Sequence, residues 1–279
     1  MSVSDKYFIE AANKIINDNV SDVGMSVRPK WPDGTPAHTI KTFCYVCRYD
    51  VSKEFPLLTL RRQAFKNMVK ELLWIWQKKS NNINELDAHI WDAWADESGS
   101  IGKAYGYQLG KKYVFPEGLS DQVDHLIYDL KHNNQSRRMI TNIYNFEDLH
   151  EMHLYPCAYE TIWDVSDGKL NMTLIQRSGD MLAAAAPGGW NCCQYIILMR
   201  MIAQVTNLIP GEFVHIVNNL HIYDRHVELV KKIINNPIYP APKLWINPDI
   251  KDFYDFKLED FRLDDYEATK LEEKIEIAE

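Results

Sequence analysis

The sequence predicts a mixed α/β protein in which helices and strands are interleaved around a largely non-parallel sheet. Three observations predict this class. Apolar residues recur at helical spacing in two segments, they alternate with polar residues in a third, and a fourth segment is apolar on nearly every side. No internal repeat, low-complexity linker or hinge rich in proline and glycine interrupts the chain, so we expect a single domain over residues 1–279.

Two helices are predicted from the spacing of their apolar residues. Over residues 65–76, the positions with helical spacing are Phe65, Met68, Val69, Leu72, Ile75 and Trp76. A second helix should begin after Asp121, whose carboxylate can accept hydrogen bonds from the free N–H groups of a first turn, and end near Asn133. Its apolar positions are Val123, Leu126, Ile127 and Leu130.

A strand and a buried helix follow further along the chain. Apolar and polar residues alternate over residues 170–174, and the Asp167-Gly168 pair before them is typical of a tight hairpin turn. The run over residues 192–205 is apolar almost all round, which predicts a buried helix with Asn191 at its entrance.

Composition and charge narrow the classes of function. The chain is 46% hydrophobic and 25% charged, an ordinary profile for a globular protein with a large core. Its formal net charge of -8 argues against a broad nucleic-acid surface, so a bound anion would need a local arginine cluster. The N-terminus lacks the basic and apolar regions of a signal peptide, and no apolar run approaches the roughly 18 residues that cross a bilayer. We expect a cytoplasmic protein without membrane contact.

The cysteines raise a question about one position. Five are present, an odd count without the spacing of a zinc site, so neither a disulfide framework nor a metal is expected. Cys44 and Cys47 suit a strand and are interpreted as core packing, as are Cys192 and Cys193 at the start of the apolar helix. Cys157 stands directly behind a proline, between an acidic segment and a strand-like one. A small core residue is the commoner use of such a cysteine, and a nucleophile is the alternative.

Several polar residues depart from the predicted patterns. Glu71 shares the apolar face of the first helix, so its carboxyl group should have a raised pKa or a partner, unless it reaches water from the edge of that face. Arg137 and Arg138 precede a strand-like segment, and Arg177 ends another strand. Guanidinium groups at strand ends suit a phosphate, although each alone is more often a solvated edge. His221 would, on its own, be interpreted as structural.

From about Asp33 to its C-terminus the chain resembles the folate-dependent thymidylate synthases. The resemblance rests on motifs that occur in the family's order: IWDAWADESGSIGKAYG, SRRMI, LYPCAYE, QRSGDM, WNCCQY and HIYDRH, with KDFYDFKLEDF near the end. The segments DGTPAHT and ELLWIWQ are most similar to the branch found in Gram-positive bacteria and some of their phages.

This resemblance implies a fold and an activity. The fold is one α/β domain with a large twisted mixed sheet flanked by helices, paired with a second copy as a homodimer with shared active sites. The activity is reductive methylation of dUMP to dTMP, with 5,10-methylenetetrahydrofolate as donor of the one-carbon unit and the hydride. Cys157 would add as a thiolate to uracil C6, which makes C5 nucleophilic. A neighbouring cation must favour the thiolate, because a free cysteine is mostly protonated at neutral pH.

The resemblance also implies roles on the nucleotide side of the site. Arg177 matches the arginine that activates the thiol and binds the phosphate, and Ser178 matches a second phosphate ligand. Arg137 and Arg138 match the pair that the partner subunit inserts. Asn191 matches the amide that reads the uracil ring, where relatives that act on deoxycytidylate carry an aspartate.

Further matches concern the sugar, the proton transfers and the folate. His221 and Tyr223 match the residues that hold the 3'-hydroxyl of the deoxyribose. Glu71 matches the buried carboxylate that organises water for proton transfers, and Tyr105 the tyrosine associated with removal of the C5 proton. The residues that match positions along the folate are Trp91, Trp94 and Asp180, the last of which also borders the nucleotide.

The chain departs from the family pattern at several places. The usual N-terminal loop with a phosphate-binding arginine is replaced by DGTPAHT, and we expect Arg28, just upstream, to take its place. The loop over Leu182–Trp190 is longer than usual and borders the folate. Asn219 stands where most members have aspartate, and the terminal Glu279 stands where an aliphatic residue is usual, a change that would weaken closure over the site.

These departures leave two alternatives open. A dUMP hydroxymethylase would use the same cysteine and folate, but water would capture the exocyclic methylene before hydride transfer. A non-catalytic paralogue would only bind a nucleotide or RNA. Binding alone needs no thiolate, so the presence of Cys157, Arg177, Glu71 and Asn191 together argues against the second alternative, as does the acidic net charge.

Overall fold

The computed structural model describes residues 2–278, and Met1 and Glu279 lie outside the described residues. The predicted effect of Glu279 on closure therefore stays a prediction. The helices are α1 (Val3–Asp18), α2 (Phe65–Trp76), α3 (Gly106–Gly110), α4 (Gln122–His132), α5 (Trp190–Val205) and α6 (Val227–Ile233). Short 3-10 turns lie at Ile83–Glu85, Asp92–Trp94, Leu149–Glu151, Asp224–His226, Phe253–Asp255 and Leu258–Asp260.

The strands form one large sheet and two small ones. Their bounds are β1 (Val20–Ser21), β2 (Thr39–Asp50), β3 (Tyr113–Phe115), β4 (Gly118–Ser120), β5 (Ile140–Asn142), β6 (Ala158–Ser166), β7 (Lys169–Gln176), β8 (Gly179–Asp180), β9 (Ile209–Tyr223), β10 (Lys243–Ile246) and β11 (Phe261–Asp264). The large sheet has the order β1-β2-β9-β7-β6-β5, with β8 paired to β9. Only the β7–β9 and β8–β9 pairs of this sheet are parallel. The predicted α/β class with a mixed, largely non-parallel sheet is confirmed.

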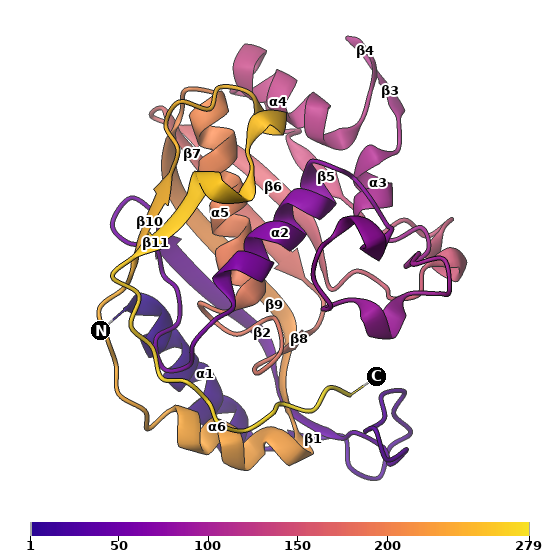
Figure 1. Cartoon of the computed structure of the whole chain (residues 1–279), viewed down its shortest axis with the longest axis vertical. Coiled ribbons are helices and arrows are strands. Elements are labelled where there is room, and N and C mark those ends of the chain that lie inside the picture. Colours follow the sequence, from indigo (N-terminus) through magenta and orange to yellow (C-terminus); the bar gives the residue numbers. More distant parts are fainter. Residues whose placement is uncertain (1, 279) are drawn as a thin grey trace.

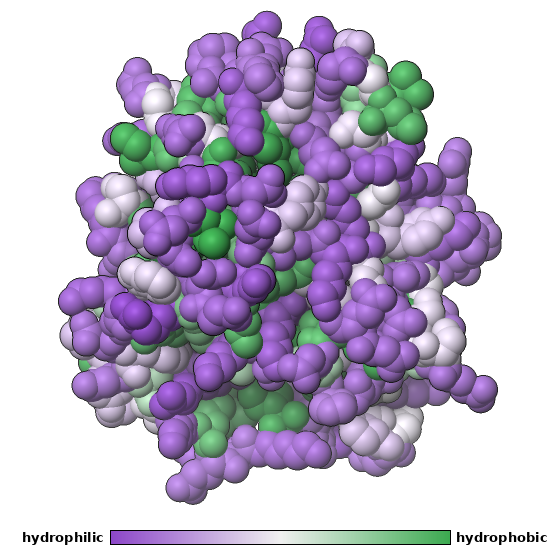
Figure 2. Space-filling model, turned by 45° about the horizontal axis from the view of Figure 1, so that its top comes forward, coloured by the Kyte–Doolittle hydropathy of each residue, from purple (hydrophilic) through white to green (hydrophobic). Residues whose placement is uncertain are grey.

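Helices α2 and α5 lie across one face of the large sheet (Figure 1). The main core fills the space between them, and α5 is buried along nearly its whole length. A second cluster lies where α1 and α6 pack beside β9. The outer surface seen in Figure 2 is mostly hydrophilic, with apolar groups in recesses between polar ones. Among residues 2–278, no helix covers the other face of the large sheet.

The elements predicted from periodicity are confirmed at their expected places. Helix α2 contains all six of the predicted apolar positions, and α4 begins after Asp121, whose carboxylate accepts from the N–H groups of Val123 and Asp124, both at 3.1 Å. The turn between β6 and β7 has positive φ at Asp167 (51°) and Gly168 (73°), as a tight two-residue hairpin requires.

Two predictions about local structure are wrong. Asn191 lies in the first turn of α5 but is not its cap, because the helix begins at Trp190 with Gly189 as the N-cap residue. The Asn191 side chain instead accepts a hydrogen bond from Gln176 at the end of β7. Cys44 is exposed, while Cys47 is buried as expected. The reason is a positive φ of 50° at Cys44, which breaks the alternation of β2 and turns this side chain out of the core.

The uncovered face of the large sheet carries apolar side chains. Phe43 is 80% exposed, Val46 43% and Ile140 45%. Ile175 and Ile216, at outward positions of the neighbouring strands, are only half-buried. Within residues 2–278, no helix is both long and apolar enough to cross a membrane. The cytoplasmic location stays a prediction.

Candidate active site

Cys157 lies immediately before β6, beside the end of β7. The backbone N–H of Arg177 donates to the Cys157 carbonyl at 2.9 Å, which sets the two residues side by side. The Arg177 side chain folds back over the same segment, where Nε donates to the Pro156 carbonyl at 2.9 Å and Nη2 to the Tyr155 carbonyl at 2.8 Å. Nη2 also lies 3.6 Å from Cys157 Sγ. The carbonyl of the proline thus helps to fix a guanidinium beside the thiol.

Opposing effects act on the Cys157 thiol. Burial raises its pKa, while the positive charges of Arg177 and Arg28 lower it, and burial prevails in the isolated chain. Arg28 belongs to the exposed loop before β2, and its charge also acts on Tyr223. The loop therefore brings a second guanidinium toward the cysteine. Arg28 was the residue expected to replace the missing phosphate arginine.

Glu71 is held in a cage of N–H donors. Trp91 Nε1 donates to Oε1 at 2.6 Å, and Trp190 Nε1 and Gln194 Nε2 both donate to Oε2 at 2.6 Å. Burial raises the pKa of the Glu71 carboxyl group, and the three donors oppose this rise by stabilising the carboxylate. The expectation of a buried carboxylate with partners is confirmed, and the alternative of a side chain that reaches water is wrong.

Tyr105 connects this cage to the cysteine. Its hydroxyl oxygen accepts a hydrogen bond from the Cys157 backbone N–H at 3.3 Å, and burial raises the pKa of the hydroxyl well above its ordinary value. Its ring stands edge-on to that of Trp91, with centroids 4.8 Å apart, and Trp94 stands edge-on to Trp91 with centroids 5.6 Å apart. Tyr105 has a φ of 46°, a strained value for a non-glycine residue of the kind that collects at functional sites.

Asn191 lies in the first turn of α5 and faces the end of β7. Gln176 Nε2 donates to Asn191 Oδ1 at 3.1 Å and to the Ser178 carbonyl at 3.0 Å. Gln176 is 1% exposed, so both of its amide hydrogens are used within the protein interior. This arrangement leaves Asn191 Nδ2 and the second lone pair of Oδ1 for another partner.

His221, Tyr223 and Asp180 meet where β8 pairs with β9. Asp180 is opposite His221 in the parallel register. Burial lowers the pKa of His221, and the Asp180 carboxylate raises it in part. His221 Nδ1 lies 3.1 Å from Asn219 Oδ1, so the asparagine that replaces the usual aspartate still contacts this ring. Tyr223 stands edge-on to His221 at 5.2 Å, and burial raises its pKa to about 12.

A model of the family described as thymidylate synthase matches residues 7–278. The chain belongs to the thymidylate synthase family. The thymidylate synthase of Bacillus licheniformis is 48% identical over 271 residues, which are 95% of this chain and 96% of the relative. That of Bacillus phage phi3T is 46% identical with the same coverage. The solved structure of thermostable thymidylate synthase A from Bacillus subtilis superposes with a TM-score of 0.92 at 44% identity, covering 98% of this chain and 99% of that one.

These findings confirm the predicted family and its Bacillus-like branch. Thymidylate synthases are methyltransferases of dTMP biosynthesis, so the chain is an enzyme of this class. The paralogue without catalytic activity is thereby disfavoured. Within residues 2–278, no group of three or more His, Cys, Asp or Glu side chains is arranged to hold a metal ion.

Among the described residues, the side chains of Arg137 and Arg138 make no polar contact with the site residues around Cys157. Both lie on the loop between α4 and β5 and are exposed. Among the described residues, neither side chain forms an ion pair or a hydrogen bond with another. In a single chain, these two guanidinium groups are thus available to bind an anion or a group from another subunit.

The sequence analysis missed three residues that the structure brings to the site. Trp190 and Gln194 donate to Glu71, and Gln176 donates to Asn191. A signal was present for both glutamines, because Gln176 continues the buried, apolar face of β7 and Gln194 lies on the largely apolar α5. The same signal had singled out Glu71. Trp190 gave no such signal, since a tryptophan beside an apolar helix suits the core.

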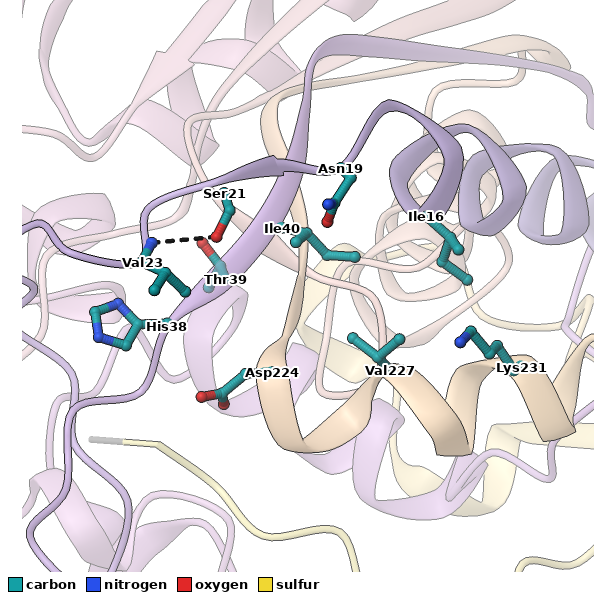
Figure 3. A pocket seen from close by; sticks show the side chains of 10 residues that line it. All are labelled: Ile16, Asn19, Ser21, Val23, His38, Thr39, Ile40, Asp224, Val227 and Lys231. Atoms are coloured by element: carbon teal, nitrogen blue, oxygen red, sulfur yellow. Dashed lines mark hydrogen bonds between the residues drawn. The ribbon is translucent and has the colours of Figure 1, made fainter.

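A separate recess lies between α1, β2 and α6 (Figure 3). It has a volume of about 520 Å³ and is lined by Ile16, Asn19, Ser21, Val23, His38, Thr39, Ile40, Asp224, Val227 and Lys231. None of the predicted site residues lines it. The ring of His38 is paired there with the Asp22 carboxylate, 3.1 Å from Nδ1, so its polar group already has a partner.

Proposed function

We propose that residues 1–279 form one catalytic domain that converts dUMP to dTMP, with 5,10-methylenetetrahydrofolate as co-substrate and Cys157 as nucleophile. The observation that carries this proposal is the Arg177 guanidinium, fixed by two backbone carbonyls with Nη2 3.6 Å from Cys157 Sγ. A guanidinium held this close favours the thiolate over the thiol. A cysteine used only for packing would need no such charge.

In the proposed reaction, the thiolate adds to uracil C6, and the electron pair of the C5–C6 bond moves toward C5 and O4. The folate supplies the one-carbon unit that C5 takes up and the hydride that reduces it to a methyl group. Glu71 orders water for proton transfer at O4, which its position among three N–H donors supports because the carboxylate can persist there despite burial. Tyr105 would take part in removal of the C5 proton, a role supported by the hydrogen bond between its hydroxyl oxygen and the Cys157 backbone N–H. Expulsion of the thiolate completes the cycle.

The residues around the predicted folate position suit such a ligand. Trp91 and Trp94 stand edge-on to each other, and separately the Asp180 carboxylate acts on the Arg61 guanidinium. Arg61 is 8% exposed, and its Nε has no hydrogen-bond partner among the described residues. The Asp180 carboxylate acts on this buried guanidinium, but Nε still has no acceptor, and the glutamyl carboxylate of a folate would supply one. Trp91, Trp94, Asp180 and Arg61 would therefore hold the folate.

Different residues would recognise the phosphate, the sugar and the base of the nucleotide. Arg177, Ser178 and Arg28 would bind the phosphate, which their positions around Cys157 support. His221 and Tyr223 would hold the 3'-hydroxyl.

Asn191 would read the base. Its free Nδ2 can donate to O4 while Oδ1 accepts from N3–H, which suits uracil.

We further propose that the enzyme is a homodimer formed through the uncovered sheet face. Phe43, Val46 and Ile140 make this face apolar, and a second copy of the same chain would cover it. Arg137 and Arg138 lie beside its edge strand β5, where a partner's site could receive them.

A complementation experiment tests the sharing of sites. Cys157→Ser and Arg138→Ala proteins, each inactive alone, are mixed, unfolded and refolded together. In a mixed dimer one site has Cys157 and an intact Arg138 from its partner, so about a quarter of wild-type activity should return if subunits pair at random. Two Arg138→Ala chains refolded alone serve as the control. No recovery in the mixture would contradict the shared site.

A further inference from the structure

A buried chain of hydrogen bonds runs from the middle of the sheet to Asn191. His215 Nε2 lies 2.9 Å from Gln176 Oε1, and Gln176 Nε2 donates to Asn191 Oδ1 at 3.1 Å. His215 and Gln176 are each 1% exposed. His215 lies on the core-facing side of β9, where its strand neighbours at the same face are the apolar Phe213 and Val217. Neither the proposed chemistry nor the predicted contacts with the nucleotide use this histidine.

The chemistry of each group fixes the direction of the chain. Gln176 Oε1 can only accept, so His215 Nε2 must carry its hydrogen. Gln176 Nε2 then points away from His215, and its two hydrogens go to the Ser178 carbonyl and to Asn191 Oδ1. The Cys192 thiol lies within hydrogen-bonding reach of the imidazole, and no carboxylate among the described residues is paired with it. His215 Nε2 is thus the donor at the start of the chain.

This polarity matters because uracil and cytosine present opposite patterns to an amide. Uracil offers an acceptor at O4 and a donor at N3, whereas cytosine offers a donor at N4 and an acceptor at N3. An asparagine could read cytosine simply by turning its amide over. In Asn191 such a flip would place Nδ2 against the Gln176 amide hydrogens, which leaves buried donors without acceptors. Gln176 cannot follow the flip, because its own oxygen is held by His215.

We propose that His215 is a positioning residue for pyrimidine specificity, which holds Gln176, and through it Asn191, in the orientation that accepts uracil and opposes cytosine. The inference rests on the proposed function of Asn191 as the residue that reads the base. It gives a reason for the two buried polar residues, His215 and Gln176, that lead to Asn191, since buried polar networks of this kind specify one arrangement where apolar residues would only fill space. The Ser178 carbonyl holds the other hydrogen of Gln176, so His215 strengthens the orientation without being its sole determinant.

Two substitutions distinguish the effect of the His215 N–H donor from the effect of its ring. His215→Leu removes the N–H and keeps an apolar side chain, while His215→Gln places an amide N–H at a similar reach from the backbone. The measurement is the dissociation constant of the dimeric enzyme for dUMP and for dCMP, by isothermal titration calorimetry. We expect His215→Leu to reduce the preference for dUMP over dCMP by about 10-fold, because the buried hydrogen bond from His215 to Gln176 no longer opposes a flip of the Asn191 amide. His215→Gln should stay within about 2-fold of the wild type, since it keeps the donor.

Phe213→Leu is the matched control for packing. It shortens an apolar side chain on the same face of the same strand and should leave the preference for dUMP unchanged. If His215→Leu does not fold, His215→Asn replaces it, because its shorter amide does not reach Gln176. A His215→Leu or His215→Asn enzyme that keeps the full preference would overturn the inference, as would equal losses in Phe213→Leu and His215→Leu.

The Asn191→Ala enzyme distinguishes a failure of the inference about His215 from a failure of the proposed role of Asn191. If Asn191→Ala keeps the preference for dUMP, the assignment of Asn191 is wrong and the inference falls with it. If Asn191→Ala loses the preference while His215→Leu keeps it, only the inference about His215 is overturned. Loss of the preference in both, with retention in His215→Gln, supports both.

Discussion

Replacing Trp190 with phenylalanine removes one donor from the buried Glu71 carboxylate and keeps an aromatic ring in place. In the wild type, Oε2 receives the Trp190 and Gln194 N–H groups at 2.6 Å, and Oε1 receives that of Trp91 at 2.6 Å. Because these bonds favour the carboxylate against the effect of burial, losing one must raise the pKa of Glu71 further.

The size of the effect follows from the kind of bond removed. A hydrogen bond to a charged group contributes about 1.5–3 kcal/mol net, and two such donors remain after the substitution. The loss corresponds to a change on the order of 10- to 100-fold in the ratio of ionised to protonated Glu71. If the proton transfers need the carboxylate, activity on the acid side must then fall away at a higher pH than in the wild type.

The assay is the pH dependence of kcat with dUMP and the folate both saturating. Trp163→Phe is the matched control, because Trp163 is a buried indole of the same core whose N–H donates to Thr161 Oγ1 at 2.7 Å, away from Glu71. The acid limb should move upward in Trp190→Phe and stay in place in Trp163→Phe. An unmoved or downward-shifted limb in Trp190→Phe would refute the reasoning about the donor cage.

Three further predictions concern charge and stability. Arg28→Ala should raise the KM for dUMP about 10-fold or more through the loss of a charge-assisted phosphate contact, and an unchanged KM in steady-state assays would remove Arg28 from the phosphate site. Arg177→Ala should shift the alkylation of Cys157 by iodoacetamide to higher pH, because the cation that lowers the pKa of the thiol is gone; an unchanged profile would show that Arg177 does not activate it. Asp121→Ala should lower the free energy of unfolding by about 1–3 kcal/mol in urea titrations, since it removes the cap of α4 and leaves Lys79 and Lys112 with only the longer of their ion pairs, those to Asp124. Burial raises the pKa of Asp121 and those lysines lower it more, so this stabilisation is present at neutral pH and fades as the pH falls through the lowered pKa; equal loss on acidification in the wild type and Asp121→Ala would contradict it.

Local patterns were enough to predict several elements and failed where distant residues decide. Helix α2 and the hairpin turn at Asp167-Gly168 follow from periodicity and turn chemistry alone. The cap of α5 was predicted wrongly because Asn191 is a residue type common at caps, whereas its side chain accepts a hydrogen bond from Gln176 at the end of β7. The exposure of Cys44 depends on one backbone torsion that alternation does not reveal.

The same contrast holds at the site. Glu71 could be singled out because a carboxylate on an apolar face needs an explanation. Its donor Trp190 could not, because 119 residues separate the two along the chain and an indole suits a core position. The position of Arg177 at a strand end was predicted, but its two anchoring carbonyls depend on the path of the chain before β6.

The most direct test of the central claim follows the purified enzyme with dUMP and 5,10-methylenetetrahydrofolate, measuring dihydrofolate by absorbance and the nucleotide product by mass spectrometry. Cys157→Ser is run beside it. Equal amounts of dTMP and dihydrofolate from the wild type, and no product from Cys157→Ser, are the predicted result. A hydroxymethylated nucleotide with the folate left at the tetrahydro level, or product formed by Cys157→Ser, would contradict it.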